Sequence, residues 1–358
     1  MDRTDIALCY GTRPQVIKAS ALRGPLDRLG AVLAVDTGQH YDYELNALLY
    51  EQLGVRAPDI LLEVGSAGQA EQTAAVLVRA EQVFLERKPR VVVVIGDTNS
   101  TLGCALAAGK LRIPVVHVEA GLRSQDMLMA EEINRRAVDA FAAVLCAPSE
   151  RAAARLRAER LDGIVSLTGD VAYDVLCAHL GRLPPAPAPG SPYCYATVHR
   201  AELTDRPEVL CQVLTALGGL DLPVVLPLHP RTRAVLEAVA PGLALELGLT
   251  IVPPVGYLES LALTRAAAVV VTDSGGLQRE AYWLGVPCVT LRRETEWEET
   301  VELGANLALD PTAVAGLGLA VEAQRRRWAG GPLWDRTAYG SGNAAASIAA
   351  ATQPLLAA

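Results

Sequence analysis

The chain has 358 residues, a length that predicts two domains with sizeable hydrophobic cores. Hydrophobic residues make up 51% of it, yet no run reaches the roughly 18 uncharged apolar residues that a membrane span needs. The net charge of -8 and the pI of about 5.3 argue against nucleic acid as the main partner.

The cysteines and histidines indicate neither a disulfide framework nor a metal site. The seven cysteines are scattered without a CxxC pair, and their odd number excludes complete pairing. The five histidines lack metal-binding spacing such as HExxH, so we expect no metal. The amino-terminal segment lacks the long apolar region of a signal peptide, and we therefore expect a cytoplasmic protein.

Apolar, β-branched runs alternate with longer segments of helical character along the chain. The first series of expected strands is 6–11, 31–38, 90–97, 113–120, 142–148 and 164–170. The second series is 193–199, 223–229, 249–254, 267–274 and 287–292. Continuous apolar strands separated by helices predict parallel sheets covered on both faces.

The two series are separated by residues 182–193, in which five of twelve residues are proline. This composition predicts a stiff linker between domains at 1–182 and 193–335. We expect the Ala-rich tail, 342–358, to be helical and to pack back on the first domain. The predicted fold is α/β, with two Rossmann-like doubly wound domains and a central cleft where strand ends would bind a ligand.

In the first domain, charged residues follow two of the expected strands. The turn Gly11 to Lys18, GTRPQVIK, opens a helix at which Arg13 and Lys18 would suit an anion. A capped helix with surface charges is the alternative. The segment GDTNST then places Asp97 at a strand end, where it would serve acid–base chemistry or merely cap the next helix.

Two further acidic segments, HVEAGLRS and AEEINRR, follow the next strand. Glu119 lies where that strand ends, and Glu131 and Arg135 are spaced to share one helix face. A structural Glu119–Arg123 pair and a solvated helix face are the alternatives. Three carboxylates near one sheet edge, with Asp97 the third, favour acid–base chemistry because crowded carboxylates raise one another's pKa.

The second domain supplies histidines and a glycine-containing turn at its strand ends. His199 and His229 follow its first two strands, although structural histidines are more common. In TDSGGLQREA a strand runs through Ser-Gly-Gly into a helix, where backbone amides and the helix dipole would cradle a diphosphate. The chain has neither GxxxxGK[ST] nor GxGxxG, so ATP hydrolysis and NAD chemistry have no support.

The ordered set of motifs resembles the non-hydrolysing UDP-N-acetylglucosamine 2-epimerase family. From residue 11 to 296 the matching segments are GTRPQVIK, TGQH, GDTNST, HVEAGLRS, EEINR, TVHRAE, LPLHPR, GYLE, TDSGGLQREA and ETE. The resemblance implies a glycosyltransferase-B-like pair of Rossmann domains, a UDP-sugar substrate, no cofactor and a homodimer. It also implies inversion of carbon 2 by elimination and re-addition of UDP, in cell-surface polysaccharide biosynthesis.

The resemblance also implies roles for individual residues. The implied catalytic residues are Asp97, Glu119, Glu131 and His199. The implied substrate- and UDP-binding residues are Arg13, Lys18, Arg135, His229, Ser274, Gly275, Gly276, Glu280 and Arg292.

Departures from the family pattern leave the substrate open. Ala130 and Leu203 replace a proline and an asparagine of the family, and YDYEL after His40 is unlike members that bind a second, activating substrate molecule. Glu296-Trp297-Glu298 looks closer to the subgroup acting on UDP-2,3-diacetamido-2,3-dideoxyglucuronic acid. The motifs are also compatible with a hydrolysing epimerase that releases N-acetylmannosamine, with a glycosyltransferase and with a non-catalytic nucleotide-sugar-binding protein.

Overall fold

The computed structural model describes residues 4–39, 49–186, 192–331 and 334–357. The chain forms two compact units. Unit 1 comprises Met1–Leu180 with Thr337–Ala358, and unit 2 comprises Gly181–Arg336. His40, the YDYEL segment and the middle of the proline-rich linker lie outside the described residues.

Unit 1 contains a seven-stranded sheet in which all pairings are parallel, in the order β3-β2-β1-β4-β5-β6-β7. Its strands are β1 (Ile6–Tyr10), β2 (Val32–Asp36), β3 (Ile60–Leu61), β4 (Val91–Ile95), β5 (Val115–Val118), β6 (Val144–Ala147) and β7 (Ile164–Leu167). Its helices are α1 (Arg13–Asp27), α3 (Gln69–Arg87), α4 (Asn99–Lys110), α5 (Ala130–Phe141), α6 (Glu150–Glu159), α7 (Val171–His179), α16 (Ala344–Thr352) and the 3-10 segments η1 (Leu180–Arg182, at the border with unit 2) and η3 (Gln353–Leu356).

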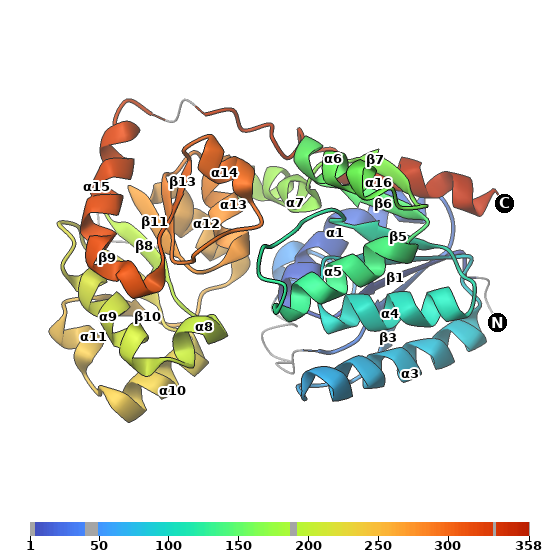
Figure 1. The fold of residues 1–358 in the computed structure, drawn as a ribbon, viewed down its shortest axis with the longest axis horizontal. Helices are drawn as coiled ribbons and strands as arrows, with labels where there is room; N and C mark the ends of the chain where they lie inside the picture. The colour runs from blue at the N-terminus through green and yellow to red at the C-terminus, as the bar shows by residue number, and fades with distance from the viewer. Residues whose placement is uncertain (1–3, 40–48, 187–191, 332–333, 358) are drawn as a thin grey trace. The chain divides into compact units, whose positions relative to one another are not determined.

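The central strands of unit 1 are buried because helices cover them. Helices α3, α4 and α5 pack side by side in one layer, and α1, α7 and α16 pack together in another (Figure 1). Every residue of β1 and β4 is buried, which explains their continuous apolar sequences.

The carboxyl-terminal segment of the chain returns to unit 1 as helix α16. Asp174, on α7, accepts hydrogen bonds from the first two backbone N–H groups of α16, those of Ala344 (3.0 Å) and Ala345 (2.7 Å). A carboxylate at this position satisfies amides that have no partner within the helix. Ile348 of α16 is completely buried.

Unit 2 repeats the same strand arrangement with six parallel strands, in the order β10-β9-β8-β11-β12-β13. Its strands are β8 (Cys194–Thr197), β9 (Val224–Pro227), β10 (Thr250–Val252), β11 (Val269–Thr272), β12 (Cys288–Thr290) and β13 (Asn306–Ala308). Its helices are α8 (Ala201–Thr204), α9 (Pro207–Gly218), α10 (Pro230–Val239), α11 (Leu243–Glu246), α12 (Tyr257–Ala266), α13 (Gly275–Leu284), α14 (Glu298–Glu302), α15 (Leu317–Arg327) and the 3-10 segment η2 (Pro311–Gly316).

The prediction of two doubly wound α/β domains is confirmed, and each of the eleven predicted strands is present. The prediction was wrong in omitting β3 and β13, which have two and three residues. Both are edge strands too short for a recognisable apolar run. All seven cysteines lie in the described part of the chain and are free. Among the described residues, every helix is too short or too polar to span a bilayer.

Candidate active site

In both sheets the order in which successive strands are added reverses between two central strands. These are β1 and β4 in unit 1 and β8 and β11 in unit 2. Open α/β sheets bind ligands beyond the carboxyl ends of such strands. Most of the predicted site residues follow a strand end in one of the two units.

Gln15 ties together the turns that follow β1 and β4. Its Oε1 accepts hydrogen bonds from the backbone N–H groups of Gly11 (2.9 Å) and Thr12 (3.2 Å). Its Nε2 lies 2.6 Å from the Ile95 carbonyl and 2.9 Å from Oγ1 of Thr98. The start of α1 is thereby held against the turn that carries Asp97.

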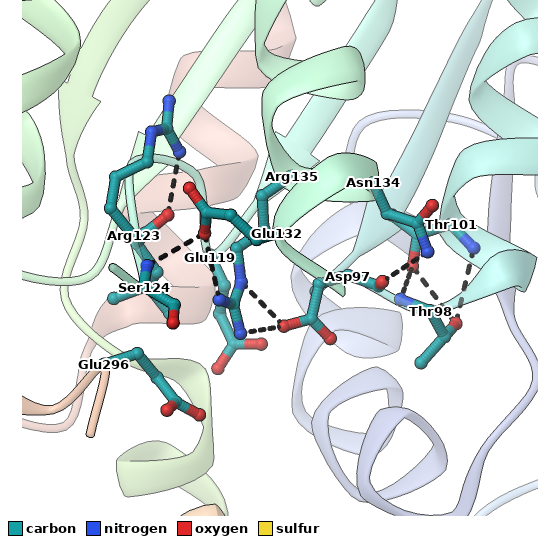
Figure 2. A network of polar contacts seen from close by, with 12 residues as sticks. Asp97, Thr98, Thr101, Glu119, Arg123, Ser124, Glu132, Asn134, Arg135 and Glu296 are labelled. Carbon is teal, nitrogen blue, oxygen red and sulfur yellow. Dashed lines mark hydrogen bonds and ion pairs between the residues drawn. The ribbon is translucent and has the colours of Figure 1, made fainter. Parts of the chain in front are cut away.

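Asp97 does not cap the helix that follows it. The capping residue of α4 is Thr98, whose hydroxyl accepts from the Thr101 backbone N–H. The Asp97 carboxylate turns instead to Arg135, whose Nε and Nη2 donate to Oδ2 at 2.8 and 2.5 Å (Figure 2). Asn134 donates to the Asp97 carbonyl at 2.9 Å. Oδ1 accepts no hydrogen bond from a described residue, and the side chain is 26% exposed.

Glu119 contacts Lys18 rather than Arg123, so the alternative of a structural Glu119–Arg123 pair was wrong. Both members of the Lys18–Glu119 ion pair are buried. Glu119 has a φ of 69°, in the left-handed region that non-glycine residues seldom adopt. A Cβ on Gly96 would lie 3.2 Å from Oε2 of Glu119, so glycine at this position leaves room for the carboxylate beside the Asp97 turn.

Glu131 and Arg135, which are spaced to share one helix face, do not form an ion pair with each other. Glu131 is half-buried and makes no ion pair with a described residue. The neighbouring Glu132 is fully buried, and its Oε2 accepts from Nη1 of Arg135 (3.3 Å) and from the Ser124 backbone N–H (2.9 Å). Its Oε1 accepts from Arg136 at 2.8 Å. The face of α5 toward the core is therefore polar, because it carries a network that includes Asp97.

Behind this group lies a buried network centred on His117 of β5. Nδ1 of His117 is 2.7 Å from Oδ1 of Asp139, and Nε2 is 2.7 Å from the Gly96 carbonyl. Arg123 donates to Asp139 at 2.7 Å and binds Glu159 at 2.8 and 2.6 Å. Burial lowers the pKa of His117, but Asp139 and Gly96 outweigh it and the pKa is raised. Burial raises the pKa of Asp139, but His117 and Arg123 leave it lowered.

In unit 2, His199 follows β8 and contacts Asp273, which follows β11. Nδ1 of His199 is 3.2 Å from Oδ1 of Asp273. Oδ2 of Asp273 accepts from the backbone N–H groups of His199 and Arg200, both at 2.8 Å. Burial raises the pKa of Asp273, but His199 and these amides outweigh burial and the pKa is lowered. The His199 side chain is 40% exposed, and its ring centre is 6.0 Å from that of His229.

Ser274, Gly275 and Gly276 form the amino-terminal turn of α13. Ser274 is the capping residue, and its hydroxyl accepts from the Leu277 backbone N–H. A Cβ on Gly275 would lie 3.2 Å from Oε1 of Glu296, whereas one on Gly276 would meet only Oγ of Ser274 at 3.8 Å. The absence of a side chain at Gly275 therefore leaves room for the loop that carries Glu296, whereas the space beside Gly276 is not filled by another side chain of the described residues.

That loop contains Arg292, Glu296 and Trp297. Arg292 and Glu296 form an ion pair of 2.9 Å. The guanidinium carbon of Arg279, on α13, lies 3.7 Å from the ring centre of Trp297 and 5.8 Å from that of Trp283. Because Trp283 belongs to α13 itself, the Arg279–Trp297 cation–π contact is the one that holds the loop against α13.

The remaining predicted residues lie on or next to helices. Arg13 is the first residue of α1. His229 directly precedes α10 and caps it by accepting from the Arg231 backbone N–H at 3.3 Å. Glu280 lies within α13 and is half-buried. Among the described residues, no group of three or more His, Cys, Asp or Glu is arranged to hold a metal ion.

Several residues with central positions were not among the predicted catalytic or binding residues. They are Gln15, His117, Glu132, Asn134, Asp139, Asp273, Arg279 and Trp297. The polar residues of α5 carried a usable signal, because Arg135 and Val138 lie three apart and therefore share the buried face. The sequence carried no such signal for the partners of His117 and Arg279, because these contacts join residues that are distant in the sequence.

The sequence model of the UDP-N-acetylglucosamine 2-epimerase family matches residues 30–353. A UDP-2,3-diacetamido-2,3-dideoxy-D-glucuronate 2-epimerase of Pseudomonas aeruginosa is 40% identical over 354 residues, covering 96% of this chain and 98% of the relative. A UDP-N-acetylglucosamine 2-epimerase of Methanococcus maripaludis is 35% identical, covering 90% and 93% of the two chains.

Among solved structures, the UDP-GlcNAc 2-epimerase of Methanocaldococcus jannaschii in complex with UDP-GlcNAc and UDP has a TM-score of 0.85. It is 35% identical, and the likeness covers 97% of this chain and 98% of that one. The predicted glycosyltransferase-B-like pair of Rossmann-like domains is thereby confirmed. This chain belongs to the UDP-N-acetylglucosamine 2-epimerase family and is an enzyme of the isomerase class.

Proposed function

We propose that the enzyme inverts carbon 2 of a UDP-2-acetamido sugar by eliminating UDP and adding it back. The observation that carries the proposal is the pair of carboxylates at neighbouring strand ends, Asp97 after β4 and Glu119 after β5, each beside a cation. A base removes the proton from carbon 2, and the C–H electron pair forms a C1=C2 double bond as the bond to UDP breaks. Protonation on the opposite face and return of UDP to carbon 1 then give the epimer.

Asp97 is the best-supported base, because Arg135 occupies only one of its carboxylate oxygens and the side chain is partly exposed. A second group must act on the opposite face of the sugar, and Glu119 and Glu131 are the candidates. Arg135 and Lys18 would keep Asp97 and Glu119 in position and add positive charge for the diphosphate.

The leaving diphosphate needs positive charge as it departs. Nδ1 of His199 lies 3.2 Å from the Asp273 carboxylate, and a proton on Nε2 would let the ring donate to a phosphate oxygen. The free amides at the start of α13 suit an anion as well. The proposed contacts to UDP are Arg13, His199, His229, Ser274, Gly275, Gly276 and Arg292 at the phosphates, and Glu280 at the ribose hydroxyls.

Two observations favour a modified sugar over UDP-N-acetylglucosamine itself. The Pseudomonas relative that acts on UDP-2,3-diacetamido-2,3-dideoxy-D-glucuronate matches almost the full length at 40% identity. Trp297, part of the Glu296-Trp297-Glu298 segment that resembles the subgroup acting on this sugar, packs on Arg279 and shapes the loop beside Gly275. We therefore propose the diacetamido uronic acid as the preferred substrate.

Proton NMR in deuterium oxide tests both proposals. The purified enzyme is incubated separately with UDP-N-acetylglucosamine and with the diacetamido uronate. A manno epimer carrying deuterium at carbon 2 supports epimerisation, and the faster substrate is the preferred one. Free 2-acetamido mannose sugar with UDP would instead identify a hydrolysing enzyme. No deuterium incorporation into either sugar would contradict the proposed reaction.

We further propose a cytoplasmic homodimer that serves cell-surface polysaccharide biosynthesis. The free cysteines support a reducing compartment. Family resemblance alone supports the dimer, and light scattering coupled to size-exclusion chromatography tests it, since a mass of one 37.8 kDa chain would exclude it.

A further inference from the structure

His117 is a fully buried histidine in the middle of a parallel sheet, where a polar ring needs a specific partner for each nitrogen. In the strand register it lies between Val94 of β4 and Leu145 of β6. Its partners are the Asp139 carboxylate and the Gly96 carbonyl, both at 2.7 Å.

The chemistry of the two partners determines the protonation state of the ring. A carbonyl oxygen has no proton, so Nε2 must donate to Gly96. Asp139 also accepts from the Gly121 backbone N–H (3.1 Å) and from Arg123 (2.7 Å), an environment that keeps a carboxylate ionised. Nδ1 must therefore donate as well. A histidine that donates from both nitrogens is an imidazolium, a buried positive charge.

This charge lies directly beneath the turn that carries Asp97. His117 holds the carbonyl of Gly96, and Asn134 holds the carbonyl of Asp97 at 2.9 Å. The backbone is thus fixed at two successive peptide groups, while Arg135 fixes the carboxylate. Gly96 has a φ of 68°, a left-handed conformation that glycine adopts readily because it has no Cβ.

We propose that His117 is a positioning residue whose buried positive charge and hydrogen bond to Gly96 hold the Asp97 turn in its reactive geometry. The proposal rests on the proposed function, in which Asp97 is the base. His117 touches no substrate and acts through the Gly96–Asp97 turn. Within the described residues, the charged groups near His117 and the Asp97 turn are Lys18, Glu119, Arg123, Glu132, Arg135 and Asp139.

The test is the steady-state kcat and KM of the full-length enzyme and its His117→Gln variant. Glutamine retains a donor for the Gly96 carbonyl but removes the charge. We expect kcat to fall about tenfold and the KM for the UDP-sugar to change less than twofold.

Val116→Ala is the matched control, since Val116 is also fully buried on β5 and, as the preceding strand residue, faces the opposite side of the sheet from His117. This variant should lose stability while kcat stays within twofold. Asp139→Asn should lower kcat as His117→Gln does, because it removes the group that retains the second proton on His117. A wild-type kcat in His117→Gln would overturn the proposal.

A second measurement does not depend on activity or on the folding of a variant. In the wild-type enzyme labelled with 15N-histidine, both ring nitrogens of His117 should remain protonated well above the ordinary histidine pKa. A neutral ring at pH 7.5 would overturn the proposal even if the enzyme is an epimerase. If instead the wild type turns over neither UDP-sugar, the proposed function fails, while the 15N result still decides whether the buried charge exists.

Discussion

An aspartate follows the switch-point strand in each unit, Asp97 after β4 and Asp273 after β11, yet the two side chains have opposite environments. Asp97 is bound by an arginine from a helix and leaves one oxygen partly exposed. Asp273 is 1% exposed and turns inward to backbone amides. The same residue at the same topological position is thus available for chemistry in unit 1, whereas in unit 2 it orients a histidine.

The largest predicted effect distinguishes these two roles. Asp97→Asn should lower kcat roughly 10²–10⁴-fold, the range for loss of an acid–base group. UDP affinity should remain within a few-fold, because the amide retains the shape of the side chain. Turnover by NMR and UDP binding by calorimetry provide the two measurements. Normal turnover in this variant would remove Asp97 from the mechanism and with it the contrast with Asp273.

The Arg13→Ala variant tests whether unit 1 also contributes to UDP binding. Arg13 begins α1, and loss of a charge-assisted hydrogen bond should weaken UDP binding by about 1.5–3 kcal/mol. Pro14→Ala, at the neighbouring exposed position, is the control and should leave affinity unchanged. Calorimetric affinity equal to that of the wild type would leave the diphosphate to the residues of unit 2.

Asp273→Asn should act chiefly on stability. Its carboxylate accepts two charge-assisted backbone hydrogen bonds, so neutralising it should destabilise unit 2 by about 1–2 kcal/mol. All four tryptophans, at 283, 297, 328 and 334, lie in unit 2, and their fluorescence during urea unfolding reports on that unit. If the urea unfolding midpoint of Asp273→Asn equals that of the wild type, the Asp273 carboxylate is not needed to hold the His199 turn.

The sequence was sufficient for the strands and insufficient for the contacts that distinguish these aspartates. Buried parallel strands must be apolar along their whole length, so β1 and β4 were evident. On α5, in contrast, local spacing allowed Glu131 or Glu132 to face Arg135. The choice depends on the Arg135–Asp97 contact, 38 residues apart, and the Asp273–His199 contact spans 74 residues. Helix periodicity contains no information about such distant partners.

The smallest predicted effect is the pH dependence of stability. The lowered pKa values of Asp139 in unit 1 and Asp273 in unit 2 predict a loss of stability in acid for both units, whereas the raised pKa of His117 predicts a further loss in unit 1 above neutral pH. The folded pKa of Asp273 is lowered, so its contribution to stability is complete above the unfolded pKa of about 3.9 and is lost as pH falls through the folded value. The folded pKa of His117 is raised, so its contribution is complete below about pH 6.5 and is lost as pH rises through the folded value.

Hydrogen exchange measured by mass spectrometry resolves the two units and therefore their pH dependences. Between about pH 6.5 and 8.5, below the ordinary cysteine pKa, peptides of β4 and β5 should lose protection beyond the intrinsic change in exchange rate. His117→Gln should abolish this loss, and Asp273→Asn should abolish the acid loss in β8 and β11. If exchange protection of β4 and β5 in His117→Gln depends on pH as in the wild type, the pH dependence of unit 1 comes from a group other than His117. The buried charge would then not distinguish the two switch points in the way that their contacts indicate.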